Sequence, residues 1–139
     1  MKLKNLRVPY GLSVHGSDEI AAVNKVLKSS TQMGKNVISF EKKISKLFSK
    51  KYGLMVNSGS SALLLAMETL DIPEGSEIIT PALTFSTTVG YIVKNNFVPV
   101  FVDVKEGTYC VNESKIKNLI TKKTKAIVAP HLMGNIVNW

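Results

Sequence analysis

The sequence predicts an α/β domain with a largely parallel sheet that helices cover on both faces. From residue 54 to residue 129, short and almost purely apolar segments alternate with segments of helical periodicity. Turn-forming sequences separate them, such as DIPEGS at 71–76 and KEGT at 105–108. Uninterrupted apolar strands are typical of parallel sheets, because neither face of such a sheet meets water. We therefore expect a three-layer α/β/α architecture.

Two helices are expected before this alternation begins. The first covers residues 17–30, with Ser17 as its N-cap and acidic residues in its first turn. Its apolar residues recur at helical spacing, at Ile20, Val23 and Leu27. The second covers residues 37–53 and is expected to end at Gly53. One apolar stripe runs along it, formed by Val37, Phe40, Ile44, Leu47 and Phe48.

The alternating part supplies the remaining elements. Strands are expected at residues 54–56, 77–80, 98–104 and 126–129, and helices at 59–70, 86–94 and 112–120. The helix at 59–70 contains ALLLAM, which has no polar face, so it is expected to be buried against the sheet.

Composition limits the class of protein. The chain has 139 residues, of which 45% are hydrophobic, enough for the core of one globular domain. Its net charge of +8 comes from lysines on apparent helix faces, and Arg7 is the single arginine. This pattern favours solvated helix faces over a nucleic-acid-binding surface, where clustered arginines and aromatics are expected.

Localisation signals and cysteine pairs are absent from the sequence. Cys110 is the single cysteine, which excludes an internal disulfide and a CxxC site. The amino terminus lacks the apolar core of a signal peptide, and no segment approaches the about 18 apolar residues of a membrane span. We expect a soluble cytoplasmic protein with neither a membrane nor a nucleic acid as partner.

The sequence NSGSS at 57–61 is the first candidate site. Ligands of α/β sheets bind at the carboxyl ends of the strands, where helices begin. A helix that begins near Gly59 would direct free backbone N–H groups and its positive dipole end toward a phosphate. Ser60 and Ser61 would add hydroxyl donors. The alternative is a simple helix cap, because serine and glycine are also ordinary helix-start residues. Neither a Walker motif nor GxGxxG is present.

A second candidate is Phe85, in the loop TPALTFSTTV after the next strand. An aromatic ring in a polar loop could stack on a flat cofactor, and the alternative is a core aromatic. Asp103 ends a strand and is expected to form a turn, although its position allows a site role. His15 and His131 have no second ligand nearby in the sequence, so we expect no metal site.

Five motifs together resemble the amino-terminal half of the large domain in the DegT/StrS family of pyridoxal-phosphate enzymes. They are NSGSSALLLA, ITPALTFSTTV, VPVFVDV, GTYCVN and TKKTKAIVAPHLMGN, and their order and spacing match from about Thr31 to the end. The resemblance divides the chain into an N-terminal segment with a short helix, 1–30, and the N-terminal part of the cofactor-binding domain, 31–139.

The resemblance implies a fold, a cofactor and a substrate class. The fold is that of aspartate aminotransferase (fold type I), normally in a homodimer with active sites at the subunit interface. Gly59, Ser60 and Ser61 look like the loop that holds the phosphate of pyridoxal or pyridoxamine phosphate, and Phe85 looks like the ring that stacks on its pyridine. The substrates would be nucleotide-linked 4-keto-6-deoxyhexoses of deoxysugar or surface polysaccharide pathways.

The resemblance leaves two reactions open, transamination and 3-dehydration. NSGSSA, FSTTV and the GN after His131 look more like the 3-dehydratase branch. The Schiff-base lysine or its histidine replacement, and the aspartate at the pyridine nitrogen, are expected beyond Trp139. The domain is thus expected to be incomplete at its carboxyl end, and this chain alone to be inactive.

Two other interpretations are possible. The chain could be a non-catalytic remnant of such an enzyme or a partner subunit that completes another chain's site. It could also be a basic nucleic-acid-binding domain, for which steeply salt-dependent binding of DNA or RNA would be required.

Overall fold

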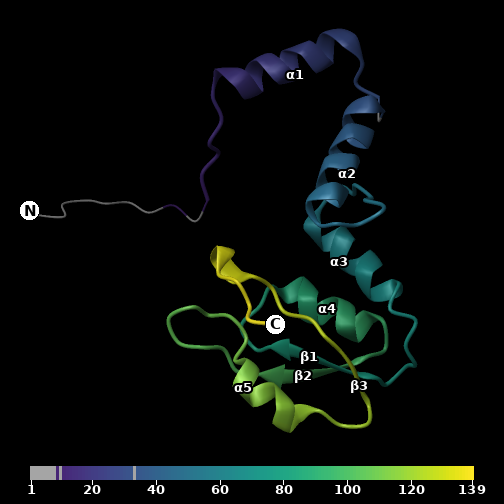
Figure 1. Ribbon diagram of the computed structural model, residues 1–139, viewed down its shortest axis with the longest axis vertical. Coiled ribbons are helices and arrows are strands. Elements are labelled where there is room, and N and C mark those ends of the chain that lie inside the picture. The colour runs from purple at the N-terminus through teal and green to yellow at the C-terminus, as the bar shows by residue number, and fades with distance from the viewer. Residues whose placement is uncertain (1–8, 10, 33) are drawn as a thin grey trace, which may run out of the picture. The chain divides into compact units, whose positions relative to one another are not determined.

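The computed structural model in Figure 1 describes residues 9, 11–32 and 34–139. The chain forms two compact units, Met1–Gly53 and Leu54–Trp139. In the first unit lie helices α1 (Ser17–Ser29) and α2 (Lys35–Leu47), and the second contains the sheet. The division between residues 30 and 31 that the family resemblance implies stays a prediction.

Helix α1 is capped one residue earlier than predicted. Its N-cap is Gly16, so the assignment of Ser17 was wrong. The reason is Glu19, whose carboxylate accepts a hydrogen bond of 2.7 Å from the Gly16 N–H. This bond lowers the pKa of Glu19, because it stabilises the charged form.

Helix α2 ends in a Schellman motif, well before Gly53. Ser49, the residue after the C-cap Phe48, has φ of +53°. Its N–H donates to the Lys46 carbonyl, and the Lys50 N–H donates to the Ser45 carbonyl, which is the bonding pattern of this motif. The prediction that Gly53 ends the helix was therefore wrong. Gly53 instead lies against α2, where a Cβ would stand 2.8 Å from the Glu41 carbonyl oxygen.

The second unit is built on a three-stranded parallel sheet in the order β2-β1-β3. The strands are β1 (Glu77–Pro81), β2 (Val98–Val102) and β3 (Thr124–Ile127). Three of the four predicted strands are thus confirmed, and β3 begins two residues earlier than expected. The predicted strand at 54–56 is wrong, because neither edge strand of the described sheet pairs with these residues and a strand exists only through its ladder.

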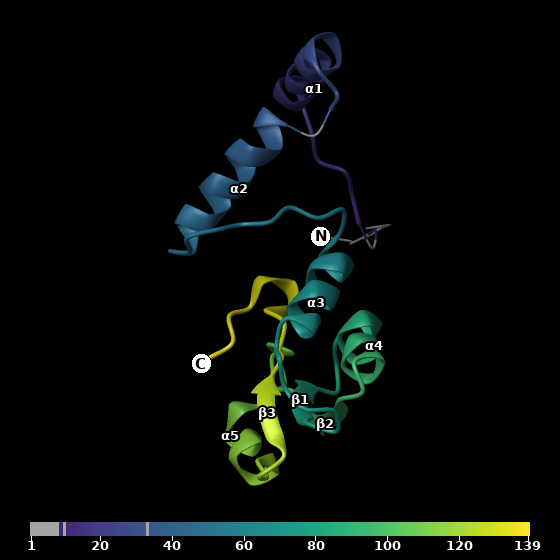
Figure 2. The same ribbon diagram turned by 90° about the vertical axis from the view of Figure 1, so that its right-hand side faces the viewer.

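Helices cover both faces of this sheet, as Figure 2 shows. On one face lie α3 (Gly59–Glu68) and α4 (Ser86–Lys94), and on the other α5 (Glu113–Ile116) with the 3₁₀ turn η1 (Lys117–Leu119). A further 3₁₀ turn, η2 (Leu132–Gly134), comes after β3. The predicted three-layer α/β/α architecture is confirmed, and the helix predicted at 112–120 is an α-helical turn that continues as 3₁₀.

Two successive residues of the central strand pack into the two opposite hydrophobic layers. Ile78 is buried with Met67 of α3 and Ile92 of α4, whereas Ile79 is buried with Val102 and its neighbours beneath α5. Successive side chains of a strand point to opposite faces, and both isoleucines are completely buried. Both faces of β1 are therefore covered.

Helix α3 is less buried than its apolar sequence predicts. Within ALLLAM only Met67 is fully buried, while Leu65 is 38% exposed and both alanines are exposed. The helix rests on the sheet and on α4 along one side only, so its outer side stays open in this chain. The prediction that this helix packs against the sheet is confirmed for the side that carries Leu63 and Met67, and its outer side is exposed.

Replacing Ile79 with alanine should lower the free energy of unfolding by about 2–5 kcal/mol, because a cavity would form in the buried layer. Urea denaturation followed by circular dichroism measures this change. Ile136→Ala is the matched control, since Ile136 is 77% exposed. Its expected effect is within about 0.5 kcal/mol. Equal losses in the two variants would contradict the assignment of Ile79 to the core.

Candidate functional site

Helices α3 and α4 both begin at the carboxyl edge of the sheet. Helix α3 leads through residues 69–76 into the amino end of β1, so it runs antiparallel to the strands. Helix α4 comes after the carboxyl end of β1 and leads to the amino end of β2, so it has the same direction. The two helices pack against each other. The NSGSS loop and Phe85 are therefore at the edge where α/β sheets bind ligands.

Hydrogen bonds among its own side chains order the loop before α3. Ser58 is the N-cap, and its hydroxyl oxygen accepts a hydrogen bond of 3.1 Å from the Ser61 N–H. The Ser61 hydroxyl donates to Asn57 Oδ1 at 2.6 Å. Of the three predicted phosphate-binding residues, Ser61 is thus the one whose amide and hydroxyl already have partners within the loop.

Gly59 and Ser60 offer the free donors of this helix end. They are the first two residues of α3, so helix geometry gives their N–H groups no intrahelical acceptor. A Cβ at Gly59 would meet no heavy atom within 4 Å, which leaves open space beside the backbone. The first turn of α3 carries no acidic residue that would repel an anion. The helix end therefore fits a phosphate group by its donors, its dipole and its space.

Phe85 is the N-cap residue of α4 and lies on the surface. Its exposed fraction is 63%, and it belongs to neither hydrophobic cluster of the second unit. Thr84 Oγ1 hydrogen-bonds Thr88 Oγ1 at 3.1 Å, and the Thr88 N–H donates to the Phe85 carbonyl at 2.9 Å. These two bonds fix the backbone on both sides of Phe85. The ring is thus held in an accessible position and is not a core aromatic of this chain.

Asp103, at the end of β2, has a structural role within its loop. Its carboxylate accepts hydrogen bonds from the Val104 N–H and from Lys115 Nζ, the latter at 3.2 Å. The Lys115 bond lowers the pKa of Asp103, and the Val104 amide adds to this effect. Lys105 similarly pairs with Glu113 and lowers the pKa of that carboxyl. These contacts join the segment after β2 to α5. The turn of this segment lies at 106–108, so the prediction that Asp103 forms a turn was wrong.

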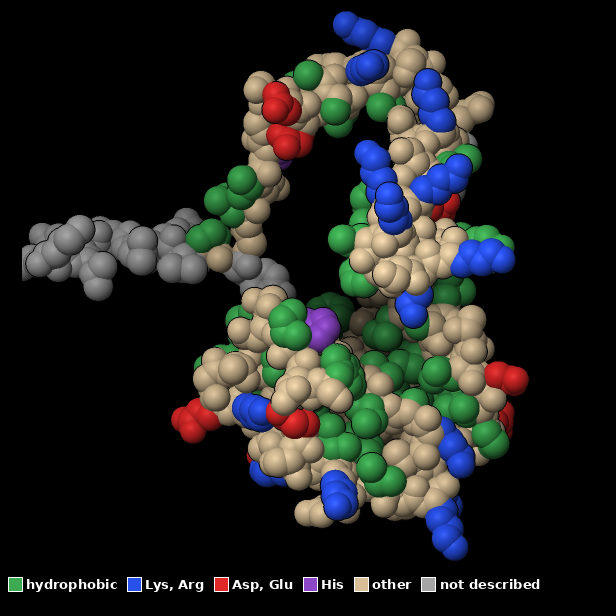
Figure 3. All heavy atoms as spheres, in the orientation of Figure 1, with side chains coloured by type: hydrophobic (Ala, Val, Ile, Leu, Met, Phe, Trp, Pro, Cys, Tyr) green, Lys and Arg blue, Asp and Glu red, His purple; other side chains and the backbone are tan. Residues whose placement is uncertain are grey.

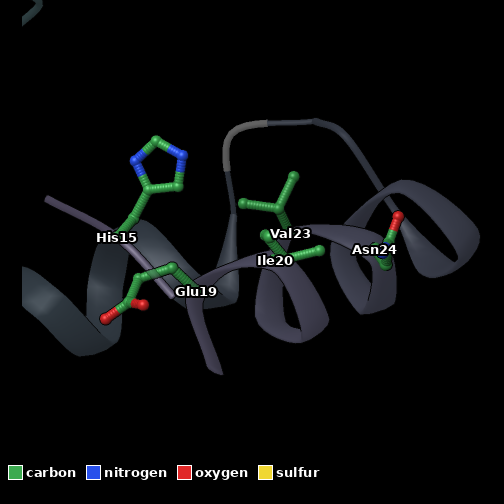
Figure 4. Close-up of a pocket in the computed structure, with 5 residues that line it drawn as sticks. All are labelled: His15, Glu19, Ile20, Val23 and Asn24. Carbon is green, nitrogen blue, oxygen red and sulfur yellow. The ribbon is translucent and has the colours of Figure 1, made fainter. Parts of the chain in front are cut away.

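Neither histidine lies in a cluster of metal ligands. His131 Nδ1 accepts a hydrogen bond of 3.0 Å from the Val137 N–H, and its ring meets Trp139 edge to face. His15 borders a surface hollow along α1, which Figure 4 shows with its other lining residues, Glu19, Ile20, Val23 and Asn24. Among the described residues, no group of three His, Cys, Asp or Glu side chains could hold a metal ion.

The residues that hold the site in shape were not predicted from the sequence. Ser58 and Asn57 organise the loop, and Thr84 and Thr88 fix the backbone at Phe85. A signal was present for the caps, because Asn and Ser before a helix commonly bond its first amides. The threonine pair spans the start of α4, which a sequence pattern alone does not define to the residue.

Replacing Ser58 with alanine should destabilise the second unit by about 1 kcal/mol, because the Ser61 N–H would lose its acceptor. Hydrogen exchange is expected to accelerate first at Ser61. Ser114→Ala, which removes an exposed serine near the start of α5, is the control and should leave the Ser61 exchange rate unchanged. Unaltered Ser61 exchange in the Ser58 variant would show that the cap does not hold the loop.

Replacing Lys115 with glutamine should raise the pKa of Asp103 toward its ordinary value of 3.8, because its principal hydrogen-bond donor is lost. A carboxyl NMR titration measures this pKa, and Lys117→Gln is the control that keeps the pair. In the wild-type chain the lowered pKa of Asp103 stabilises the fold above 3.8, and this contribution is lost as the pH falls through the lower folded value. An Asp103 pKa that is equal in wild type and K115Q would refute the pairing.

Comparisons with known proteins relate this arrangement to a family. The sequence profile of the DegT/DnrJ/EryC1/StrS aminotransferase family matches residues 14–139. A dTDP-4-dehydro-2,6-dideoxy-D-glucose 3-dehydratase of Saccharopolyspora spinosa is 38% identical over 135 residues, which cover 91% of this chain and 29% of that protein.

Solved structures agree with the sequence match. The GDP-4-keto-6-deoxy-D-mannose-3-dehydratase of E. coli, with bound hydrated PLP, has a TM-score of 0.80 at 33% identity over 88% of this chain and 33% of its own. An aminotransferase from Psychrobacter cryohalolentis has a TM-score of 0.80 at 32% identity over 92% of this chain and 33% of its own. The chain therefore spans about a third of the length of these relatives. The aspartate-aminotransferase-like fold is confirmed, and the chain belongs to the DegT/DnrJ/EryC1/StrS aminotransferase family.

Proposed function

We propose that this chain forms part of a pyridoxal-phosphate or pyridoxamine-phosphate enzyme that acts on a nucleotide-linked 4-keto-6-deoxyhexose. The observation that carries the proposal is the open amino end of α3 at Gly59, at the same edge of the sheet as the exposed ring of Phe85. A phosphate and a flat ring are two parts of this cofactor that a protein can hold without a covalent bond.

In this proposal each site residue has a separate task. The N–H groups of Gly59 and Ser60 bind phosphate oxygens, and the Ser60 hydroxyl adds a donor. Ser61 contributes its hydroxyl once the bond to Asn57 is exchanged for one to phosphate. Phe85 packs on the pyridine and keeps water from that side. When bound, the cofactor supplies an electron sink for carbanion chemistry at the sugar.

The similar proteins include 3-dehydratases and an aminotransferase, which supports 3-dehydration or transamination as the reaction of the whole enzyme. The Saccharopolyspora and E. coli proteins are 3-dehydratases, and the Psychrobacter protein is an aminotransferase. A spore coat polysaccharide biosynthesis protein of Bacillus subtilis is also 36% identical, in keeping with a role in polysaccharide pathways. The dehydratase relatives, together with the NSGSSA and FSTTV sequences, favour 3-dehydration.

By itself the chain should bind the cofactor weakly and without turnover. No lysine occurs between Lys51 and Lys94, so both site loops lack a residue for a Schiff base. The alternatives of a non-catalytic remnant and of a partner subunit belong to the same proposal, because each keeps the phosphate loop. We further infer a cytoplasmic homodimer for the whole enzyme. Among the described residues, no helix combines the length and apolar character of a membrane span.

Pyridoxamine 5′-phosphate is the probe that tests the site in this chain. It has no aldehyde, so it cannot form adducts with the many surface lysines. We expect binding in about the millimolar range, since a third of the fold supplies two of the cofactor's contacts. In ¹⁵N-resolved NMR the amide signals of Gly59 and Ser60 should move most. Pyridoxamine without phosphate should leave them unmoved.

Phe85→Leu should weaken this binding about fivefold, by loss of about 1 kcal/mol of ring stacking. The matched control is Phe101→Leu, because Phe101 is also an exposed phenylalanine, at 51%, and lies in β2 outside both loops. The proposal fails if inorganic phosphate and pyridoxamine 5′-phosphate move only the amide signals of lysine-rich regions. It also fails if Phe85→Leu and Phe101→Leu bind pyridoxamine 5′-phosphate with equal affinity.

A further inference from the structure

The whole positive charge of the chain belongs to its first unit. Of the 18 Lys and Arg residues, eleven lie in residues 1–53, together with three of the 10 acidic residues, which gives +8. The second unit has seven of each sign, so its net charge is zero. The excess of positive charge is therefore not spread evenly over the chain, although the lysines themselves occur from one end of the sequence to the other.

Helix α2 arranges part of this charge as one face. Lys35, Lys42 and Lys46 are separated by seven and four residues, so they lie on the same side of the helix. Lys43 lies next to them, and Lys50 lies in the turn after the helix. All five are exposed, and Figure 3 shows lysine side chains standing out along this segment. We call these five residues the lysine face of α2.

The lysine face lies on a helix with excess positive charge. Helix α2 contains four lysines and one carboxylate, Glu41, whereas the ion pairs of Lys94, Lys105 and Lys115 all lie in the second unit. The first turn of α2 contains no acidic residue. Like charges at this spacing repel one another and weaken a helix. The lysine face thus costs stability in the free chain, and an anionic partner would remove that cost.

Lys35, Lys42 and Lys46 lie on the side of α2 opposite its apolar stripe, whereas Lys43 lies at the edge of the stripe, three residues after Phe40 and four before Leu47. Lys42 and Ile44 are two positions apart, or about 200° around the axis. Ile44 is 38% exposed and belongs to the stripe with Phe40 and Leu47.

The residue type indicates the class of partner. Arginine is preferred where a carboxylate or phosphate is gripped in a fixed geometry, and lysine is depleted in protein interfaces. Lys35, Lys42 and Lys46 have no aromatic residue on their side of α2, and Phe40 lies beside Lys43 on the apolar stripe. A flexible ammonium suits a surface of diffuse negative charge, and clusters of four to eight Lys or Arg residues bind anionic lipid headgroups.

We propose that the lysine face of α2 binds the surface of an anionic membrane. The contact is peripheral and electrostatic, with no inserted segment. This replaces the expectation from the sequence that the lysines are simply solvated and that no membrane is a partner. Each lysine near such a surface strengthens binding about fivefold, and the effect falls off within a Debye length.

Sedimentation of the full chain with vesicles tests the proposal. Vesicles of phosphatidylcholine containing about one-quarter phosphatidylglycerol should bind the chain at an ionic strength of about 0.15 M and release it at about 1 M. Pure phosphatidylcholine vesicles should not bind it. The variant K35Q/K42Q/K46Q should bind about a hundredfold more weakly. K117Q/K122Q/K123Q is the matched control, which loses the same total charge from the second unit and should bind nearly as wild type.

A charge-preserving variant separates charge from folding. K35R/K42R/K46R keeps the positive face and should retain binding, and circular dichroism checks that each variant keeps its helix content. Equal losses in the two glutamine variants would assign the binding to net charge and overturn the role of α2. Salt-insensitive binding, equal binding to neutral vesicles, or no binding to either would also overturn it. Tighter binding to duplex DNA than to the anionic vesicles would assign the face to nucleic acid instead.

Discussion

The fold of the second unit depends on a central strand that is buried on both faces. Ile78 and Ile79 point in opposite directions and are both completely buried, so β1 requires a strand on each side and helices above and below. The parallel pairing fixes the direction of α4, because this helix must return the chain from the carboxyl end of β1 to the amino end of β2, and α3, which leads into the amino end of β1, runs the same way. The amino ends of both helices consequently meet at the carboxyl edge, where a site for an anion and a ring can form.

Features encoded by periodicity could be predicted from the sequence, and features decided by a distant partner could not. Helix α4 and the three layers were predicted correctly, since alternation and turn residues encode them. The strand at 54–56 failed because strands need a neighbour that a local pattern does not reveal. The packing of ALLLAM against the sheet was predicted correctly, but the exposure of its outer side was not, because exposure depends on what covers a helix and not only on its composition.

The candidate site shows the same division. Gly59 and Phe85 could be singled out from residue type and position, because a glycine at a helix start and an aromatic in a polar loop are each unusual enough to notice. A helix cap at NSGSS was predicted as the alternative to a phosphate site, but the individual bonds of Asn57, Thr84 and Thr88 were not, because they depend on backbone geometry at the helix starts. The sequence therefore indicates the groups that face a ligand better than those that hold them in place.

Ser61 connects the two kinds of residue. Its amide is capped by Ser58 and its hydroxyl donates to Asn57, so the loop satisfies its own polar groups when no anion is present. A hydroxyl rotates freely, and a phosphate oxygen is a stronger acceptor than a neutral amide oxygen, by roughly a factor of two in bond strength. The exchange of Asn57 for phosphate would thus be favourable and would need no movement of the backbone. The loop is preorganised at its amides and adaptable at its hydroxyl, which suits a site that must hold a phosphate in one fixed position.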